Sequence, residues 1–131
     1  MSNYLLDTGP VLYHFRGKKR AVQLIRQLAI NNKLSLSAIT RAEVRAGMKP
    51  EERFATNKLL MRFITLDVDR EIADRAGEII GSLHRQGLTI GLPDALIAAT
   101  AITYNLTLVT YNRAHFEIVH GVSLYPIIDD N

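Results

Sequence analysis

Short apolar segments alternate with longer amphipathic segments along the chain. The short segments hold three to five residues and end at polar or turn-forming residues, which is typical of buried β-strands. They predict strands at 3–6, 34–37, 64–68, 106–110 and 122–124. The longer segments repeat apolar residues every three or four positions and therefore predict helices.

The apolar spacing predicts helices at about 10–16, 18–30, 40–48, 50–63 and 70–85, and a further helix that begins near Pro93. In the helix at 50–63 the expected apolar stripe contains Phe54, Leu59 or Leu60, and Phe63. Residues 111–116 are expected to form a loop or a single helical turn.

This alternation of strands and helices favours the α/β class, with a parallel sheet covered by helices on both faces. The chain shows no internal repeat, no low-complexity segment and no linker. A length of 131 residues is ordinary for one domain, so we expect residues 1–131 to form a single domain.

The stretch from Ile90 to Ala101 reads as the start of a buried helix. Gly91 permits the preceding turn, and Pro93 suits the first helical positions because its missing N–H would be unsatisfied there anyway. Asp94 follows in the first turn, ahead of an almost unbroken apolar run. Its carboxylate either interacts with the positive end of the helix or points into a site, and both interpretations stay open.

Further polar residues follow the predicted strands. Asp7 ends the first strand, Glu43 comes shortly after the second, and Asn112 comes just after the fourth. Asp94 begins the helix that leads into the fourth strand. Because sites in parallel sheets gather beyond the carboxyl ends of the strands, these groups can converge at one edge.

Each carboxylate also has a purely structural interpretation. Asp7 can cap the following helix. The sequence from Thr40 to Glu43 matches a capping box, in which Glu43 reaches back to the Thr40 N–H. The functional alternative is a site for Mg²⁺ or Mn²⁺, because converging carboxylates repel one another unless a cation lies among them. Such an ion can activate water and stabilise charge on a phosphate.

Composition limits the possible chemistry. The chain is 47% hydrophobic and 22% charged, which suits one ordinary core, and its absence of cysteine excludes disulfides and thiolate metal sites. A net charge of +3 permits an anionic partner such as RNA without requiring one. The chain shows no signal-peptide pattern and no apolar run of about 20 residues. We therefore expect a soluble cytoplasmic protein with no membrane partner.

Other catalytic patterns are missing from the sequence. The four histidines, His14, His84, His115 and His120, do not have the spacing of a zinc site. The chain contains neither a GxSxG nucleophile elbow nor a GxxxxGK[ST] phosphate-binding loop. A carboxylate-based metal site is the chemistry that the residues favour most.

Four motifs occur in order along the chain: Tyr4–Thr8, Ser37–Val44, Gly91–Ala99 and Leu108–Phe116. With these motifs the chain resembles the PIN-domain family, specifically the VapC-like toxins of type II toxin–antitoxin pairs. The resemblance implies a PIN-like three-layer α/β fold, with a central parallel sheet of four or five short strands flanked by helices. It also implies a metal-dependent endoribonuclease that cleaves RNA phosphodiesters.

The resemblance implies a catalytic site in which Asp7, Glu43 and Asp94 hold Mg²⁺ or Mn²⁺. The usual fourth acidic position falls on Asn112, whose side chain is neutral, so a second metal ion is less expected. Hydroxyl groups are expected to orient the carboxylates or a water: Thr8, Ser37 and Thr110. If Glu43 binds metal, the capping box and the metal site compete for the same side chain.

Basic residues are candidates for contacts with the RNA backbone: Arg16, Lys18, Lys19, Arg20 and Arg113. The structural alternative is an ordinary solvated loop and helix start. Phosphate contacts would make RNA binding strongly dependent on salt, but they would not select a base sequence.

The resemblance further implies a homodimer and a VapB-type antitoxin, with DNA reached only through the antitoxin. The apolar residues Val11, Leu12 and Phe15 are candidates for an antitoxin groove, with ordinary core as the alternative. A catalytically weak PIN-like domain that binds RNA or protein stays open because of Asn112. A different metal-dependent phosphohydrolase is a further alternative.

Overall fold

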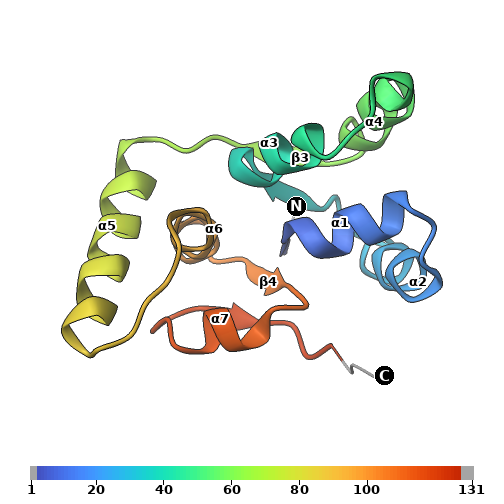
Figure 1. The fold of residues 1–131 in the computed structure, drawn as a ribbon. Helices are drawn as coiled ribbons and strands as arrows, with labels where there is room; N and C mark the ends of the chain where they lie inside the picture. The colour runs from blue at the N-terminus through green and yellow to red at the C-terminus, as the bar shows by residue number, and fades with distance from the viewer. Residues whose placement is uncertain (1–2, 128–131) are drawn as a thin grey trace.

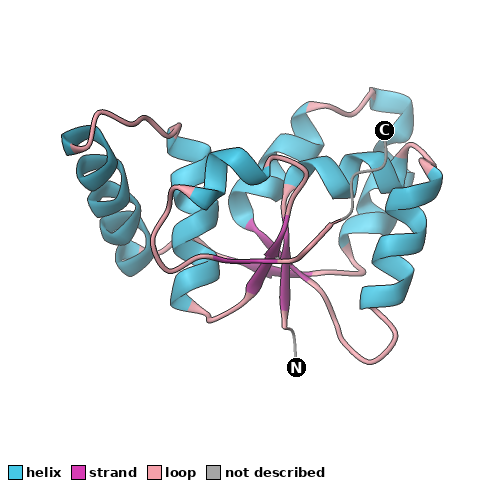
Figure 2. Ribbon diagram, turned by 90° about the horizontal axis from the view of Figure 1, so that it is seen from below, coloured by secondary structure: helices cyan, strands magenta, loops and turns pink. Residues whose placement is uncertain are grey.

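The computed structural model describes residues 3–127 and has a five-stranded sheet between two layers of helices (Figure 2). All strand pairs are parallel, and the order across the sheet is β3-β2-β1-β4-β5. The predicted α/β fold is therefore confirmed. The strands are β1 (Tyr4–Leu6), β2 (Ser35–Ser37), β3 (Ile64–Leu66), β4 (Thr107–Val109) and β5 (Ser123–Leu124).

Within residues 3–127, a helix follows each of the strands β1 to β4. The helices are α1 (Thr8–Phe15), α2 (Lys19–Leu28), α3 (Ala38–Ala46), the 3₁₀ turn η1 (Pro50–Glu52), α4 (Arg53–Leu60), α5 (Arg70–Arg85), α6 (Leu92–Thr103) and α7 (Arg113–Glu117). The helix predicted at 50–63 is thus divided into η1 and α4 and ends at Leu60. The expected turn at 111–116 forms the short helix α7.

The two faces of the sheet bury separate cores. Leu6 and Val109 pack with side chains from α1 to α4, whereas Leu5 and Leu108 pack with side chains from α5 to α7. Figure 1 shows these two groups of helices on opposite sides of the central strands. Because successive strand residues point to opposite faces, a strand covered on both sides is buried at successive positions, as Leu5 and Leu6 of β1 are.

Small side chains let α5 and α6 lie close together. Ala76 of α5 packs with Ala95 and Ala99 of α6, and all three are fully buried with Ile72. The apolar character of α6 on most sides, visible in the sequence, therefore reflects contact with the sheet on one side and α5 on the other.

The capping-box interpretation of Glu43, which was the structural alternative to a metal site, is wrong. Helix α3 begins one turn earlier than the pattern suggests, because Ser37 at the end of β2 is its N-cap and its hydroxyl oxygen accepts the Ile39 N–H at 3.1 Å. Thr40 is consequently a buried residue within the helix. Glu43 lies in the second turn, too far along the helix to serve as a capping-box partner.

The apolar stripe expected at 50–63 is correct only in part. Leu59, Leu60 and Phe63 are buried, but Phe54 is 81% exposed. Phe54 precedes Leu59 by five positions, which places it about 140° away around the helix axis. In α1, Val11 is fully buried in the core, so the core interpretation holds for this residue.

Membrane insertion has no support in the described part of the chain. Within residues 3–127, none of the helices combines the length and the hydropathy that a membrane span requires.

The α5–α6 contact predicts a sharp difference between two Ala→Leu substitutions. Ala99→Leu should lower the free energy of unfolding by about 1–3 kcal/mol, because the tight contact has no space for three further carbon atoms. Ala73→Leu on the exposed side of α5 is the control and should change it by less than about 0.5 kcal/mol. Urea unfolding followed by circular dichroism measures both, and equal effects would contradict this packing.

Candidate active site

The carboxyl ends of β2, β1 and β4 lie side by side at one edge of the sheet. Asp7 directly follows β1, Ser37 ends β2, and Thr110 directly follows β4. We call this region the acidic edge, because Asp7, Glu43 and Asp94 contribute carboxylates to it. The expected gathering of polar groups beyond the strand ends therefore has a simple topological origin.

Asp7 is held in place from two directions. Its side chain is almost fully buried, and its Oδ1 accepts the Thr8 backbone N–H at 2.8 Å. Its Oδ2 accepts the Thr110 hydroxyl at 2.8 Å. Asp7 is also the N-cap residue of α1, so capping and participation in the acidic edge are compatible for this residue.

The Thr8 hydroxyl connects α1 to α3. It donates to Glu43 Oε1 at 2.6 Å, although Glu43 itself is exposed. The hydroxyl oxygens of Thr8 and Thr40 are 3.4 Å apart. Because Thr8 has one hydroxyl proton and Glu43 accepts it, Thr40 is the donor in that second contact. Thr8 thus contacts both Asp7 and Glu43, through its backbone and its side chain respectively.

Asp94 has a partner that sequence reasoning did not single out. It lies in the first turn of α6, and its Oδ2 is 3.2 Å from His115 Nδ1 of α7. The only available signal was weak: His115 lies three residues after Asn112, which is one helical turn. Evaluating the histidines solely as zinc ligands missed this contact with a carboxylate.

The other two carboxylates act electrostatically on Asp7. Burial raises the pKa of Asp7 above its ordinary value, and the negative charges of Asp94 and Glu43 raise it further. The hydrogen bonds from Thr110 and Thr8 act in the opposite direction. Asp7 therefore lies close enough to both other acids for their charges to act on it.

The residues present fit a hard divalent cation by their chemistry. Among residues 3–127, no three His, Asp or Glu side chains are arranged closely enough to bind one ion as they stand. Instead, Glu43 accepts from Thr8, and Asp94 contacts His115. The donor atoms that these residues offer are nevertheless carboxylate oxygens, which Mg²⁺ and Mn²⁺ prefer as ligands, and the charges of Glu43 and Asp94 both act on Asp7.

The other predicted polar residues have different surroundings. Thr110, besides donating to Asp7, accepts the backbone N–H of Asn112 at 3.0 Å. Asn112 is exposed and precedes α7. Ser37 is fully buried and caps α3, so its hydroxyl is used at a helix end.

The basic candidates divide into two groups. Arg16 pairs with Glu52, and Arg113 donates to the Tyr125 carbonyl at 2.7 Å, so both side chains have partners within the fold. The second group consists of Lys18, Lys19 and Arg20, which line one cavity of about 730 Å³. The other residues that line this cavity are Tyr13, Tyr111 and Ala21.

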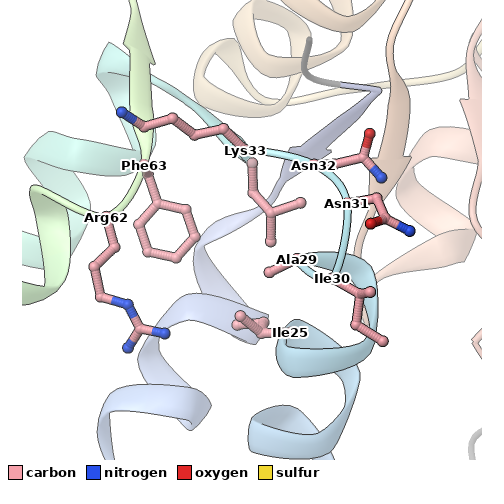
Figure 3. A pocket seen from close by; sticks show the side chains of 9 residues that line it. Ile25, Ala29, Ile30, Asn31, Asn32, Lys33, Arg62 and Phe63 are labelled. Atoms are coloured by element: carbon pink, nitrogen blue, oxygen red, sulfur yellow. The ribbon is translucent and has the colours of Figure 1, made fainter.

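A separate cavity of about 550 Å³ lies at the opposite edge of the sheet (Figure 3). Leu34 and Phe63 border it and directly precede β2 and β3, at the amino ends of these parallel strands. Figure 3 shows Asn31 and Asn32 on one side of it and Arg62 on the other. No carboxylate lines this cavity, so it is separate from the acidic edge.

Comparison with known proteins gives a consistent result. The sequence model of the PIN domain matches residues 4–121. Ribonuclease VapC10 of Mycobacterium tuberculosis is 35% identical over 114 residues, which are 87% of this chain and 86% of the relative. Ribonuclease VapC2 of Rickettsia felis is 31% identical over 127 residues, which are 92% of this chain and 95% of the relative.

A solved structure extends the similarity to three dimensions. The crystal structure of VapBC2 from Rickettsia felis, bound to a DNA fragment from their promoter, contains a chain that is 29% identical to this one. The TM-score is 0.81, and the match covers 95% of this chain and 98% of that chain.

The electrostatics of Asp7 predict that Asp7→Asn stabilises the protein at neutral pH in EDTA. Because the folded-state pKa of Asp7 is raised, the folded protein holds this proton more tightly than the unfolded chain, and ionisation of Asp7 reduces stability. The advantage of Asn should therefore diminish as the pH falls through the raised pKa. Thermal unfolding across pH measures it, with Asp67→Asn at an exposed position as control. Destabilisation by Asp7→Asn at neutral pH would contradict this interpretation.

Proposed function

Because the chain belongs to the PIN-domain family, we propose that it is a metal-dependent endoribonuclease and the toxin of a type II toxin–antitoxin pair. The observation that carries the proposal is the acidic edge. Asp7 is buried there, and the charges of Glu43 and Asp94 both act on its carboxylate. The relatives named ribonucleases support RNA as the substrate.

In this proposal Asp7, Glu43 and Asp94 hold Mg²⁺ or Mn²⁺ through their carboxylate oxygens. The ion supplies a more acidic bound water and stabilises negative charge on the phosphate. Thr8 and Thr110 keep the carboxylates of Glu43 and Asp7 in position through their hydroxyl groups.

Two residues at the start of α7 complete the proposed site. His115 restrains Asp94 by its 3.2 Å contact, which limits the rotation of that carboxylate. Asn112 is exposed beside Thr110, and its amide can donate to a phosphate oxygen without adding negative charge. A neutral group at this position reduces repulsion of the RNA backbone.

The proposed partners follow from the relatives. The similar structure from Rickettsia felis is a VapBC2 complex bound to promoter DNA. For this chain we accordingly propose a VapB-type antitoxin, a homodimeric toxin, and contact with operator DNA through the antitoxin. An intracellular RNA substrate and an antitoxin made by the same cell both require a cytoplasmic location.

The second candidate function is an RNA-binding or protein-binding PIN module with little catalytic activity. The observation that favours it is Asn112, which supplies no charge at a usually acidic position. The same observation favours one metal ion over two.

The decisive experiment is cleavage of a total-RNA pool by protein purified free of antitoxin. Discrete cuts are expected with Mg²⁺ or Mn²⁺ and none with EDTA. Asp94→Asn should abolish cleavage, because it removes one of the three carboxylates, whereas Asp67→Asn at an exposed position should not. RNA left intact by folded protein that still binds Mn²⁺ would favour the binding module.

The contact between His115 and Asp94 predicts a graded effect. His115→Ala should lower cleavage by about 10-fold or more, because Asp94 loses its restraint and metal binding weakens. Raising the Mn²⁺ concentration should restore part of the activity. His84→Ala, at an exposed position on α5, is the matched control. Equal activity of the two variants at limiting Mn²⁺ would show that the contact has no role.

A further inference from the structure

Two tyrosines from distant parts of the chain lie side by side next to the acidic edge. Tyr13 belongs to α1, and Tyr111 lies in the loop between β4 and α7. Their ring centroids are 5.5 Å apart, and the ring planes are inclined by 33°. Tyr13 is 50% exposed, so a large part of its ring is available to a ligand.

The same cavity is lined by cations. Lys18, Lys19 and Arg20 are exposed at the start of α2 and share the cavity of about 730 Å³ with the two tyrosines. We call this cavity the tyrosine–lysine groove. Its lining contains no acidic residue.

The turn between α1 and α2 determines how these cations lie relative to Tyr13. Gly17 has a φ of +74° and its N–H donates to the His14 carbonyl at 3.0 Å. The Lys18 N–H donates to the Tyr13 carbonyl at 2.9 Å. This pair of bonds is a Schellman motif, which ties the backbone of Lys18 to the last turn of α1. The position of the lysine backbone next to Tyr13 is therefore built into the fold.

The charges at the start of α2 are unfavourable for the helix itself. Lys18 is the N-cap residue without a side-chain capping bond, and the first turn contains no acidic residue. Cations near the positive end of a helix reduce its stability, and three consecutive cations also repel one another. An anion bound in the groove would offset both effects.

The groove lies next to the acidic edge through Tyr111. Tyr111 directly follows Thr110, whose hydroxyl donates to Asp7. The ring of Tyr111 also lies against the first turn of α1, since a Cβ added to Gly9 would be 3.5 Å from its Cδ2 atom. A polymer with its reacting group at Asp7 would therefore reach the tyrosines with its next units.

We propose that the tyrosine–lysine groove binds unpaired RNA next to the cleavage site, with a base stacked on Tyr13 and flanking phosphates contacting Lys18 and Lys19. The proposal rests on the proposed function, in which RNA is the substrate. Adjacent aromatic faces and cations are the combination that single-stranded nucleic acids require. An acidic peptide would use the cations, but its carboxylates would not stack on the tyrosine rings. The groove thus selects single strands over duplexes, whose bases are already stacked.

The absence of tryptophan from the chain allows a direct test. Tyr13→Trp introduces a single indole whose fluorescence reports on stacking. In protein that also carries Asp7→Asn, so that cleavage does not interfere, short single-stranded RNA should quench this emission. The same RNA as a duplex, and polyglutamate, should not. Quenching by polyglutamate, or equal quenching by duplex, would overturn the proposal in favour of an anionic peptide or simple charge attraction.

Substitutions of the tyrosine and of the lysines separate the contribution of base stacking to RNA binding from the contribution of charge. In the same Asp7→Asn background, Tyr13→Ala should weaken binding of labelled single-stranded RNA about 5- to 100-fold, and Tyr13→Phe should retain it. Tyr104→Ala is the matched control, since Tyr104 is 46% exposed and lies at the far end of α6 from Asp94. Changing Lys18 and Lys19 together to Gln should reduce the slope of log affinity against log salt by about 1.4. Equal affinities of the Tyr13→Ala and Tyr104→Ala proteins would overturn the proposal.

The outcomes for the groove and for the enzyme are distinguishable. Binding and quenching by single-stranded RNA without any cleavage by the wild-type protein would support the groove and overturn the nuclease. If the wild-type protein cleaves RNA with metal, and Tyr13→Ala changes neither this cleavage nor the affinity for single-stranded RNA, the nuclease is supported and the groove is overturned.

Discussion

The carboxylate of Asp7 is almost fully buried, and it needs hydrogen bonds that other elements of the chain must supply. Thr110 provides one from the end of β4, and the Thr8 N–H provides another from α1. The Thr110 hydroxyl in turn accepts the Asn112 N–H, so the loop after β4 depends on the same interaction. Asp7 thereby joins the central strand pair, the first helix and the loop that carries Tyr111.

The surroundings of Asp7 disfavour its negative charge. Burial of Asp7 and its proximity to Asp94 and Glu43 all raise its pKa, which means that its ionised form is disfavoured in the folded protein. A perturbed carboxylate at the meeting point of several elements is typical of a functional site.

Charges of opposite sign lie next to one another at this end of the molecule. In the function that we propose, the acidic edge holds a cation near the reacting phosphate, and the tyrosine–lysine groove binds the phosphates and bases that follow. Tyr111 lies between the two regions, directly after Thr110 and against the first turn of α1. The N-cap residue Lys18 makes no side-chain capping bond, and the first turn of α2 contains no acidic residue, so an anionic ligand there would be favoured by the positive helix end.

Local patterns in the sequence determined the strands, most of the helices and the parallel α/β class. The apolar repeat of a strand or of a helix can be recognised within a short stretch of sequence, without knowledge of distant contacts. The sequence also supplied the prediction that Asp7, Glu43 and Asp94 form the site, through strand ends and family motifs. The tertiary structure decided which donor each carboxylate meets: the capping box at Thr40 was wrong, because Ser37 begins α3 earlier. The contact of His115 with Asp94 and the pairing of Tyr13 with Tyr111 join elements distant in sequence. Such contacts depend on how helices pack across the sheet, which no local periodicity records.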